Sequence, residues 1–330
     1  MRALTIGDGG SLAVEDRERP RPGPGEVVVR VHGAGLNRAD LLQRAGRYPP
    51  PSDAPTDVPG LEFAGVVEET GPGVDAPVAG ERVFGIVGGG AQAEYVGTRA
   101  EHCATVPDGL ELVLAGGVPE TFMTAHDALV TQAGLQPGER VLVHAAGSGV
   151  GTAVVQLATA WKCPTVGTAR RQSKLDTAAA LGLGDGIVAP SPFDAVALAQ
   201  QITAVAGPCD VTIDLVGGPY LETDLHAAAP RGRIVLVGTL AGGTSTFPIL
   251  VAMGKRLTVT GTGLRARSNA EKAEVTDAFA VDVAPLLGHD GIEPVVDEIV
   301  PLAEAERAYE RLLVTTTSRG RSRSFRAIPA

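Results

Sequence analysis

A glycine-rich turn follows a short, mostly apolar stretch in the middle of the chain. The turn comes after Val141 to His144 and is formed by Gly147, Ser148, Gly149, Val150 and Gly151. Glycines at such a turn let the backbone approach a pyrophosphate closely, and the N-terminus of the following helix stabilises its charge. A glycine-rich string alone is also typical of a flexible turn. Here, however, a strand, the turn, a helix and a second strand follow one another within about 30 residues, which favours a dinucleotide site.

The residues after the second of these strands indicate which dinucleotide to expect. A site that prefers NADH has Asp or Glu about 20 residues beyond the turn, where the carboxylate accepts a hydrogen bond from the ribose 2′-hydroxyl. This chain has no acid there and instead has Arg170, Arg171, Ser173 and Lys174. Guanidinium, hydroxyl and ammonium groups suit a 2′-phosphate, so the sequence predicts NADPH. The alternative is that these groups only solvate the start of a helix, although the missing acid still disfavours NADH.

Short apolar segments alternate with helix-length segments from about residue 140. The expected strands are 140–144, 164–169, 187–188, 210–216, 233–238 and 258–261. The expected crossover helices are 150–161, 172–181, 194–206 and 220–229. This alternation predicts βαβ units and therefore an α/β fold with a doubly wound parallel sheet of the Rossmann type.

The residues before about 120 have a different pattern, in which short strands are separated by Gly and Pro. The expected strands are 26–31, 63–68, 82–87 and 93–96. They predict a small β-rich domain. Near the C-terminus we expect helices at 271–287 and 303–313, and strand-like segments at 298–300 and 325–329 that return to the first domain.

Length and composition limit the class of protein. The chain has 330 residues, 44% of them hydrophobic and 20% charged, which predicts two globular domains. It contains no run of about 20 apolar residues, and its start lacks the apolar core of a signal peptide, so a cytoplasmic protein without a membrane partner is expected.

Charge and cysteine content exclude further classes. A formal net charge of −10 argues against a nucleic-acid surface. Cys103, Cys163 and Cys209 are too widely spaced for a structural zinc site or a disulfide framework. The basic run Arg319 to Arg326 is an exception to the acidic balance, and it is either a solvated tail or a contact for an anion or partner.

With these residues in view, the chain resembles the medium-chain dehydrogenase/reductase superfamily and, within it, the zinc-free quinone oxidoreductases related to zeta-crystallin. The resemblance is carried by Ala34 to Asp40, Arg44 to Pro51, Pro59 to Gly65, Thr121 to His126 and His144 to Gly151. It implies a GroES-like domain at 1–121 and 264–330, a Rossmann NADPH-binding domain at 122–263, a cleft between the two domains, and a homodimer.

The chain departs from the zinc-dependent members of the superfamily at the ligand positions. Those members supply a cysteine and a Gly-His-Glu where this chain has Asn37 and Gly60-Leu61-Glu62, and they often carry a four-cysteine loop that is absent here. Because thiolate and imidazole ligands are missing, no catalytic zinc is expected.

The resemblance also assigns residues to the cofactor and the substrate. Asn37 and Thr124 would contact the nicotinamide end, and Gly238, Thr239 and Leu240 would follow the fifth Rossmann strand beside the cofactor. Tyr48 would line the cleft.

Tyr48 is the favoured hydrogen-bond donor to the substrate. Its phenol, with an ordinary pKa of about 10, stays protonated at neutral pH and can donate without a change of charge. Packing beside Pro49 to Pro51 is the alternative. Asn37 and Asp40 are further catalytic candidates, although the carboxylate of Asp40 can equally cap a helix that begins near Leu41.

Hydride transfer to an activated acceptor is the reaction that fits this set of residues, because a quinone or enone accepts hydride without a Lewis acid. The favoured function is an NADPH-dependent quinone oxidoreductase. One alternative is an enone or enoyl-thioester reductase in a biosynthetic pathway, and another is a non-catalytic NADPH-binding protein. Aromatic residues make up only 4% of the chain, so there are few platforms for a stacked quinone and the sequence does not identify the acceptor.

Overall fold

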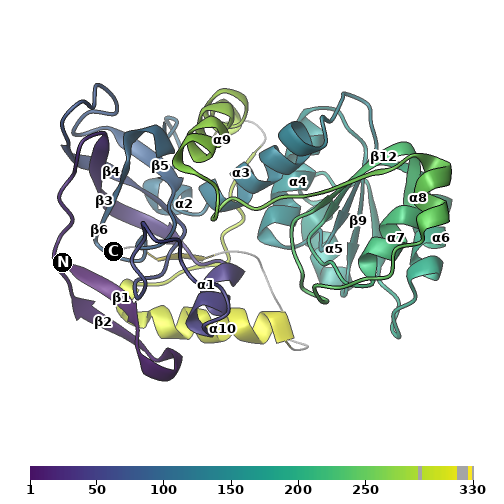
Figure 1. The fold of residues 1–330 in the computed structure, drawn as a ribbon, viewed down its shortest axis with the longest axis horizontal. Helices are drawn as coiled ribbons and strands as arrows, with labels where there is room; N and C mark the ends of the chain where they lie inside the picture. Colours follow the sequence, from purple (N-terminus) through teal and green to yellow (C-terminus); the bar gives the residue numbers. More distant parts are fainter. Residues whose placement is uncertain (289–291, 318–325, 329–330) are drawn as a thin grey trace. The chain divides into compact units, whose positions relative to one another are not determined.

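The chain divides into two compact units. A computed structural model describes residues 1–288, 292–317 and 326–328, so the basic run from Arg319 to Arg326 lies outside the described residues except for its last position. The first unit comprises Met1–Met123 and Leu264–Ala330, and the second comprises Thr124–Gly263 (Figure 1). Among the described residues, no helix is long and apolar enough to cross a membrane.

A seven-stranded sheet lies at the centre of the described part of the first unit, with the order β14-β15-β3-β4-β5-β7 and with β6 paired to β3. The strands are β3 (Glu26–Gly35), β4 (Glu62–Thr70), β5 (Arg82–Ile86), β6 (Tyr95–Arg99), β7 (Cys103–Thr105), β14 (Glu298–Ile299) and β15 (Arg326–Ile328). These positions confirm the β-rich pattern expected before residue 120. Strand β15 pairs with β3, so the C-terminal segment completes the first sheet, as expected.

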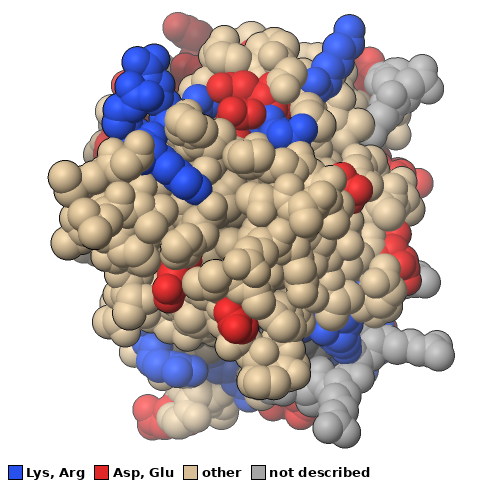
Figure 2. All heavy atoms as spheres, turned by 90° about the vertical axis from the view of Figure 1, so that its right-hand side faces the viewer, with Lys and Arg blue, Asp and Glu red and all other residues tan. Residues whose placement is uncertain are grey.

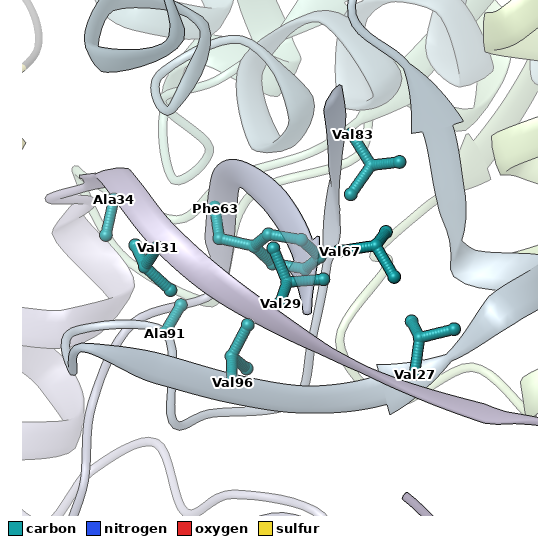
Figure 3. Close-up of a cluster of buried hydrophobic side chains, with 9 residues drawn as sticks. All are labelled: Val27, Val29, Val31, Ala34, Phe63, Val67, Val83, Ala91 and Val96. Carbon is teal, nitrogen blue, oxygen red and sulfur yellow. The ribbon is translucent and has the colours of Figure 1, made fainter. Parts of the chain in front are cut away.

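Valine side chains on one face of β3 build the core of this unit. Val27, Val29 and Val31 alternate along the strand, and the two-residue period of a strand places them on the same face. Figure 3 shows them beside Phe63 and Val67 of β4, and all five residues are buried. Removing this apolar surface from water stabilises the sheet that carries Glu62 at the start of β4.

Both ends of the chain contribute elements that pack together. A hairpin of β1 (Arg2–Ile6) and β2 (Leu12–Asp16) was not expected from the sequence. Helix α10 (Ala305–Thr317) confirms the helix expected at 303–313 and extends beyond it. Leu4 of β1 and Tyr309 of α10 belong to one buried apolar cluster.

Helix α9 (Asn269–Asp282) begins and ends at sequence signals. Ser268 and Glu271 form a capping box, in which each side chain bonds to the backbone of the other residue. The helix stops before the expected residue 287, because Pro285 follows and has no backbone N–H to continue the ladder. The short segment from Leu264 to Ser268 leads into this helix.

The second unit contains a six-stranded parallel sheet with the order β10-β9-β8-β11-β12-β13. The strands are β8 (Val141–His144), β9 (Thr165–Ala169), β10 (Asp185–Val188), β11 (Cys209–Asp214), β12 (Ala228–Leu236) and β13 (Thr258–Gly261). The order reverses between β8 and β11, which is where doubly wound sheets bind ligands. The expected Rossmann sheet is confirmed.

Four crossover helices of the second unit match the expected positions. They are α4 (Gly149–Ala160), α5 (Gln172–Ala179), α6 (Ala195–Ala206) and α7 (Tyr220–Ala227). Helix α8 (Ile249–Lys255) was not expected from the sequence, and none of its residues is buried. Because the helix buries none of its residues, its sequence lacks the three-to-four-residue apolar period by which a core-facing helix is recognised.

Candidate functional site

The glycine-rich turn lies between β8 and α4, where close contacts require its glycines. A Cβ at Gly151 would lie 2.4 Å from the carbonyl oxygen of Ala145, and a Cβ at Gly147 would lie 2.7 Å from that of Lys174. Ala145 itself has a φ of 54°, an uncommon conformation for a residue with a side chain. Ser148 is the N-cap of α4, and its Oγ accepts a hydrogen bond of 3.2 Å from the backbone N–H of Gly151. At Gly147 and Gly151 the turn carries no side chain of its own where the backbone leads into the amino end of α4.

The basic segment expected to bind a 2′-phosphate lies beside this turn. Lys174 Nζ donates to the carbonyl oxygen of Gly147 at 2.8 Å. Arg171 occupies the N-cap position of α5, and Arg170 and Ser173 are exposed at the same end of the sheet. The structure therefore brings this segment and the glycine-rich turn together at the carboxyl ends of β8 and β9.

The loop of Gly238, Thr239 and Leu240 follows β12 and contacts the loop that follows β11. The buried carboxylate of Asp214 holds this second loop in place. Asp214 Oδ1 accepts hydrogen bonds from the backbone N–H groups of Val216 and Gly217, at 2.7 and 2.9 Å. A Cβ at Gly217 would lie 2.7 Å from the carbonyl oxygen of Gly238, so the two loops are in close contact. The sequence reasoning did not identify Asp214, because its role depends on the fold of the loop that follows it.

His144 at the end of β8 joins a second strand and a helix through a buried network. Its Nδ1 lies 2.7 Å from Thr168 Oγ1 in β9, and its Nε2 lies 2.7 Å from Asp224 Oδ1 in α7. Burial lowers the pKa of His144 to about 4 and raises the pKa of Asp224 well above its usual range. Burial and then the nearby Asp224 raise the pKa of Asp214 to about 6. Burial thus favours the uncharged forms of both the imidazole and the Asp224 carboxyl.

In the first unit, Asn37 and Asp40 lie at the start of α1 (Arg38–Arg44). Asn37 is the N-cap residue, and its backbone N–H donates to Asp40 Oδ2 at 2.7 Å. The backbone N–H of Gly60 donates to Asp40 Oδ1 at 3.1 Å. The helix thus begins at Arg38 rather than near Leu41, because Asp40 bonds back to the N-cap residue from inside the first turn. Burial raises the pKa of Asp40 to about 6.

Glu62 links Asn37 to a second helix. Asn37 Nδ2 donates to Glu62 Oε1 at 2.7 Å, and the backbone N–H of Glu120 donates to Glu62 Oε2 at 2.9 Å. Glu120 lies in the first turn of α3 (Pro119–His126). Burial raises the pKa of Glu62 well above its usual range. The sequence reasoning assigned no role to Glu62, and the structure shows that it fixes the amide group of Asn37.

The remaining candidates are Tyr48 and Thr124. Tyr48 follows α1 and is half-buried, with its ring beside the guanidinium of Arg265. Burial raises the pKa of Tyr48, so its phenol is protonated at neutral pH. Thr124 lies in α3 and is buried. Within the first unit the structure thus groups Asn37, Asp40 and Tyr48 with Glu62 and Arg265, which sequence reasoning missed.

Comparisons with known proteins agree with this architecture. Residues 23–108 match the alcohol dehydrogenase GroES-like domain, and residues 149–280 match the zinc-binding dehydrogenase domain. The chain is 31% identical over 294 residues to quinone oxidoreductase-like protein 2 of Bos taurus, covering 88% of this chain and 82% of the relative. These matches show the first unit to be GroES-like and the second to be a dehydrogenase-type Rossmann unit.

Other relatives are much longer. The chain is 38% identical over 242 residues to the pikromycin polyketide synthase component PikAII of Streptomyces venezuelae, which covers 72% of this chain but 6% of that protein. Among solved structures, the quinone oxidoreductase from Thermus thermophilus, determined also in complex with NADPH, has 32% identity and a TM-score of 0.81, covering 100% of both chains.

The two units and their relatives define an oxidoreductase of the medium-chain dehydrogenase/reductase superfamily, a class that uses a nicotinamide cofactor. Within this superfamily, the chain belongs to the zinc-free quinone oxidoreductase-like family, which confirms the resemblance seen in the sequence.

The buried Asp224 leads to a prediction about pH and stability. Because its pKa is raised, the folded chain binds this proton more tightly than the unfolded chain does. The resulting contribution to stability is present at low pH and is lost as the pH rises above about 4, the ordinary value of an aspartate. We expect Asp224→Asn, which removes this titration, to gain stability relative to the wild type as the pH rises above about 4, as measured by urea unfolding.

The exposed Asp185 provides a matched control in the same unit. We expect Asp185→Asn to follow the wild-type pH dependence. If Asp224→Asn also ran parallel to the wild type, Asp224 would not carry a tightly bound proton.

Proposed function

We propose that the chain is an NADPH-dependent quinone oxidoreductase. The observation that carries this proposal is the contact between Lys174 Nζ and the carbonyl oxygen of Gly147, because it sets cationic groups beside a pyrophosphate-type turn. The full-length similarity to a quinone oxidoreductase known in complex with NADPH supports both the cofactor and the acceptor class.

The second unit fits NADPH. Gly147 and Gly151 allow close backbone contacts within and beside the turn that a Cβ would prevent, and the amino end of α4 can stabilise a pyrophosphate. The residues proposed to bind the 2′-phosphate are Arg170, Arg171, Ser173 and Lys174. Those proposed for the nicotinamide end are Thr124, Gly238, Thr239 and Leu240. When bound, NADPH supplies the hydride for the reduction.

The first unit supplies the groups proposed to serve the acceptor. The phenol of Tyr48 is protonated and can donate a hydrogen bond to an oxygen on which negative charge develops. Asn37 cannot rotate freely, because Glu62 accepts from its amide. Asp40 uses both carboxylate oxygens to bind backbone amides, so we assign it to holding α1 rather than to proton transfer.

The proposed function is tested by following NADPH and NADH oxidation with 1,2-naphthoquinone, a simple enone, an enoyl thioester and no acceptor. We expect oxidation to be fastest with NADPH and the quinone. Binding of NADPH without turnover of any acceptor would contradict the proposal and favour a non-catalytic NADPH-binding protein.

A second candidate function rests on the similarity to polyketide synthase components, which covers 72% of this chain in the case of PikAII. In this alternative the acceptor is an enone or enoyl thioester of a biosynthetic pathway. It makes a different product, because a carbon–carbon double bond is saturated and the product gains two hydrogens. Mass analysis of the enoyl-thioester reaction distinguishes the two functions.

The cofactor preference can be tested separately from the reaction. A hydrogen bond to a charged group contributes about 1.5–3 kcal/mol, so Arg170→Ala should weaken NADPH binding by roughly 10-fold or more. NADH binding is the control, because NADH differs only in lacking the 2′-phosphate, and we expect it to be unchanged. An equal loss for both dinucleotides would show that Arg170 does not contact this phosphate.

We also propose that the chain forms a homodimer through α8 and β13. Strand β13 is an edge of the second sheet, and Ile249, Leu250 and Met253 of α8 are 64%, 83% and 66% exposed. Figure 2 looks onto the side that carries α8 in Figure 1 and shows a broad, mostly uncharged area with charged side chains gathered mainly around it. Monomeric proteins rarely expose contiguous apolar surface of this kind, and a second copy of the same patch would cover it.

We expect the wild type to have the mass of a dimer in sedimentation at micromolar concentration, and Leu250→Lys with Met253→Lys to be monomeric. Val205→Lys on the exposed side of α6 is the control and should leave the mass unchanged. A wild type that is monomeric throughout this range would rule out the proposed dimer.

A further inference from the structure

Arg265 has a buried guanidinium that joins three segments of the first unit. It is 5% exposed. Its Nε donates to the carbonyl oxygen of Gly88 at 2.9 Å, and its Nη1 donates to that of Tyr48 at 2.9 Å. Its Nη2 donates to Gln43 Oε1 at 2.5 Å. One side chain thus ties the end of α1, the loop that follows α1, and the loop that follows β5.

The same guanidinium also lies against the ring of Tyr48. The distance from Arg265 Cζ to the ring centroid is 4.7 Å, within the range of a cation–π interaction. Tyr48 is therefore held at two places by one side chain, at its backbone carbonyl and at its ring. The planar guanidinium makes both contacts while its other edge donors bind Gly88 and Gln43, so lysine is not an equivalent replacement.

The charges around Tyr48 have opposing effects on its phenol. Burial and the carboxyl of Glu120 raise the pKa of Tyr48, whereas the charge of Arg265 lowers it. Burial also raises the pKa of Glu120 to about 7 and that of Asp40 to about 6, and Lys272 acts on Glu120 in the opposite direction. Arg265 is thus the cation that favours negative charge on the phenol oxygen, which is where charge builds when the phenol donates.

We propose that Arg265 is the positioning residue of Tyr48, which fixes the ring in one orientation and makes its hydroxyl a stronger hydrogen-bond donor to the oxygen of the acceptor. This inference rests on the proposed function, in which Tyr48 is that donor. Arg265 itself does not touch the reacting atoms. Its effect on the reaction passes through the tyrosine, and this dependence makes the inference testable.

The test is a double-mutant cycle of Arg265→Gln and Tyr48→Phe, with quinone reduction by NADPH as the measurement. Small displacements of a catalytic group can lower a rate by about 10- to 100-fold, and we expect a loss of kcat in this range for Arg265→Gln. In the Tyr48→Phe background the same change should alter kcat by less than about 2-fold, as for a residue whose effect requires the phenol. The KM for NADPH should not change.

Arg44 provides a matched control in the same unit. Its Nε donates to the carbonyl oxygen of Gly10, and its guanidinium lies 5.8 Å from the ring of Tyr309. Arg44→Gln therefore removes the same type of side chain from a different tyrosine. We expect it to leave kcat unchanged in the wild-type and Tyr48→Phe backgrounds, whereas a general loss of packing would affect both arginines alike.

A second measurement does not depend on turnover. Ultraviolet titration of the phenolate, taken as the difference between each protein and its Tyr48→Phe counterpart, reports the pKa of Tyr48. Arg265→Gln should raise it, and Arg265→Lys should leave it lower than Arg265→Gln does. If Arg265→Gln does not fold, Arg265→Lys is the variant for both measurements. We expect it to lower kcat, because the ammonium does not reproduce the planar set of hydrogen bonds or the contact of the guanidinium with the Tyr48 ring.

The outcomes separate the inference from the proposed function. If Arg265→Gln slows the reaction equally with and without the Tyr48 hydroxyl, the inference is overturned while the proposed function stands. If Tyr48→Phe has no effect on the rate, Tyr48 is not the donor and the inference fails with that assignment. If no acceptor is reduced at all, the proposed function fails. Independently of turnover, a Tyr48 pKa that is the same in Arg265→Gln as in the wild type would overturn the role of the arginine.

Discussion

The buried carboxyl group of Glu62 is the point on which the first unit's polar side chains depend. A carboxyl removed from water destabilises the fold unless its oxygens are hydrogen-bonded, and here one oxygen accepts from Asn37 and the other from the backbone of Glu120. The acid therefore fixes the end of one helix and the side chain at the start of another. Asp40 does the same for Asn37 and Gly60. These two acids set the position of α1, and the loop that carries Tyr48 continues from this helix.

The second unit also buries ionisable side chains, in this case a histidine and two aspartates. His144, Asp224 and Asp214 are all buried, and burial disfavours the charged forms of the histidine and of Asp224. This network lies under the carboxyl ends of the strands, beneath the loops proposed to bind the cofactor. Rigid support of this kind keeps ligand-binding loops in place.

The sequence predicted those elements whose formation depends on residues close together in the chain. The parallel strands, the crossover helices and the glycine-rich turn follow from periodicity and from glycine spacing within about 30 residues. The contacts of Arg265 could not be predicted in this way, because Tyr48 is 217 positions away in the chain and Gln43 is 222 positions away. The same is true of His144 and Asp224, which are 80 positions apart. Helix α8 was missed for another reason, since its apolar residues face outward and leave no amphipathic period.

The interrupted first unit has a consequence for the order in which the protein can fold during synthesis. The second unit is a continuous segment, so all of its strands have been made once residue 261 is synthesised. The first unit must wait for Arg265 and then for β15, which adds to β3 from the far end of the chain. On a ribosome that produces the chain from its N-terminus, the second unit can therefore be complete while β15 has yet to be made. Until then the growing chain would hold a finished second sheet and an unfinished first one.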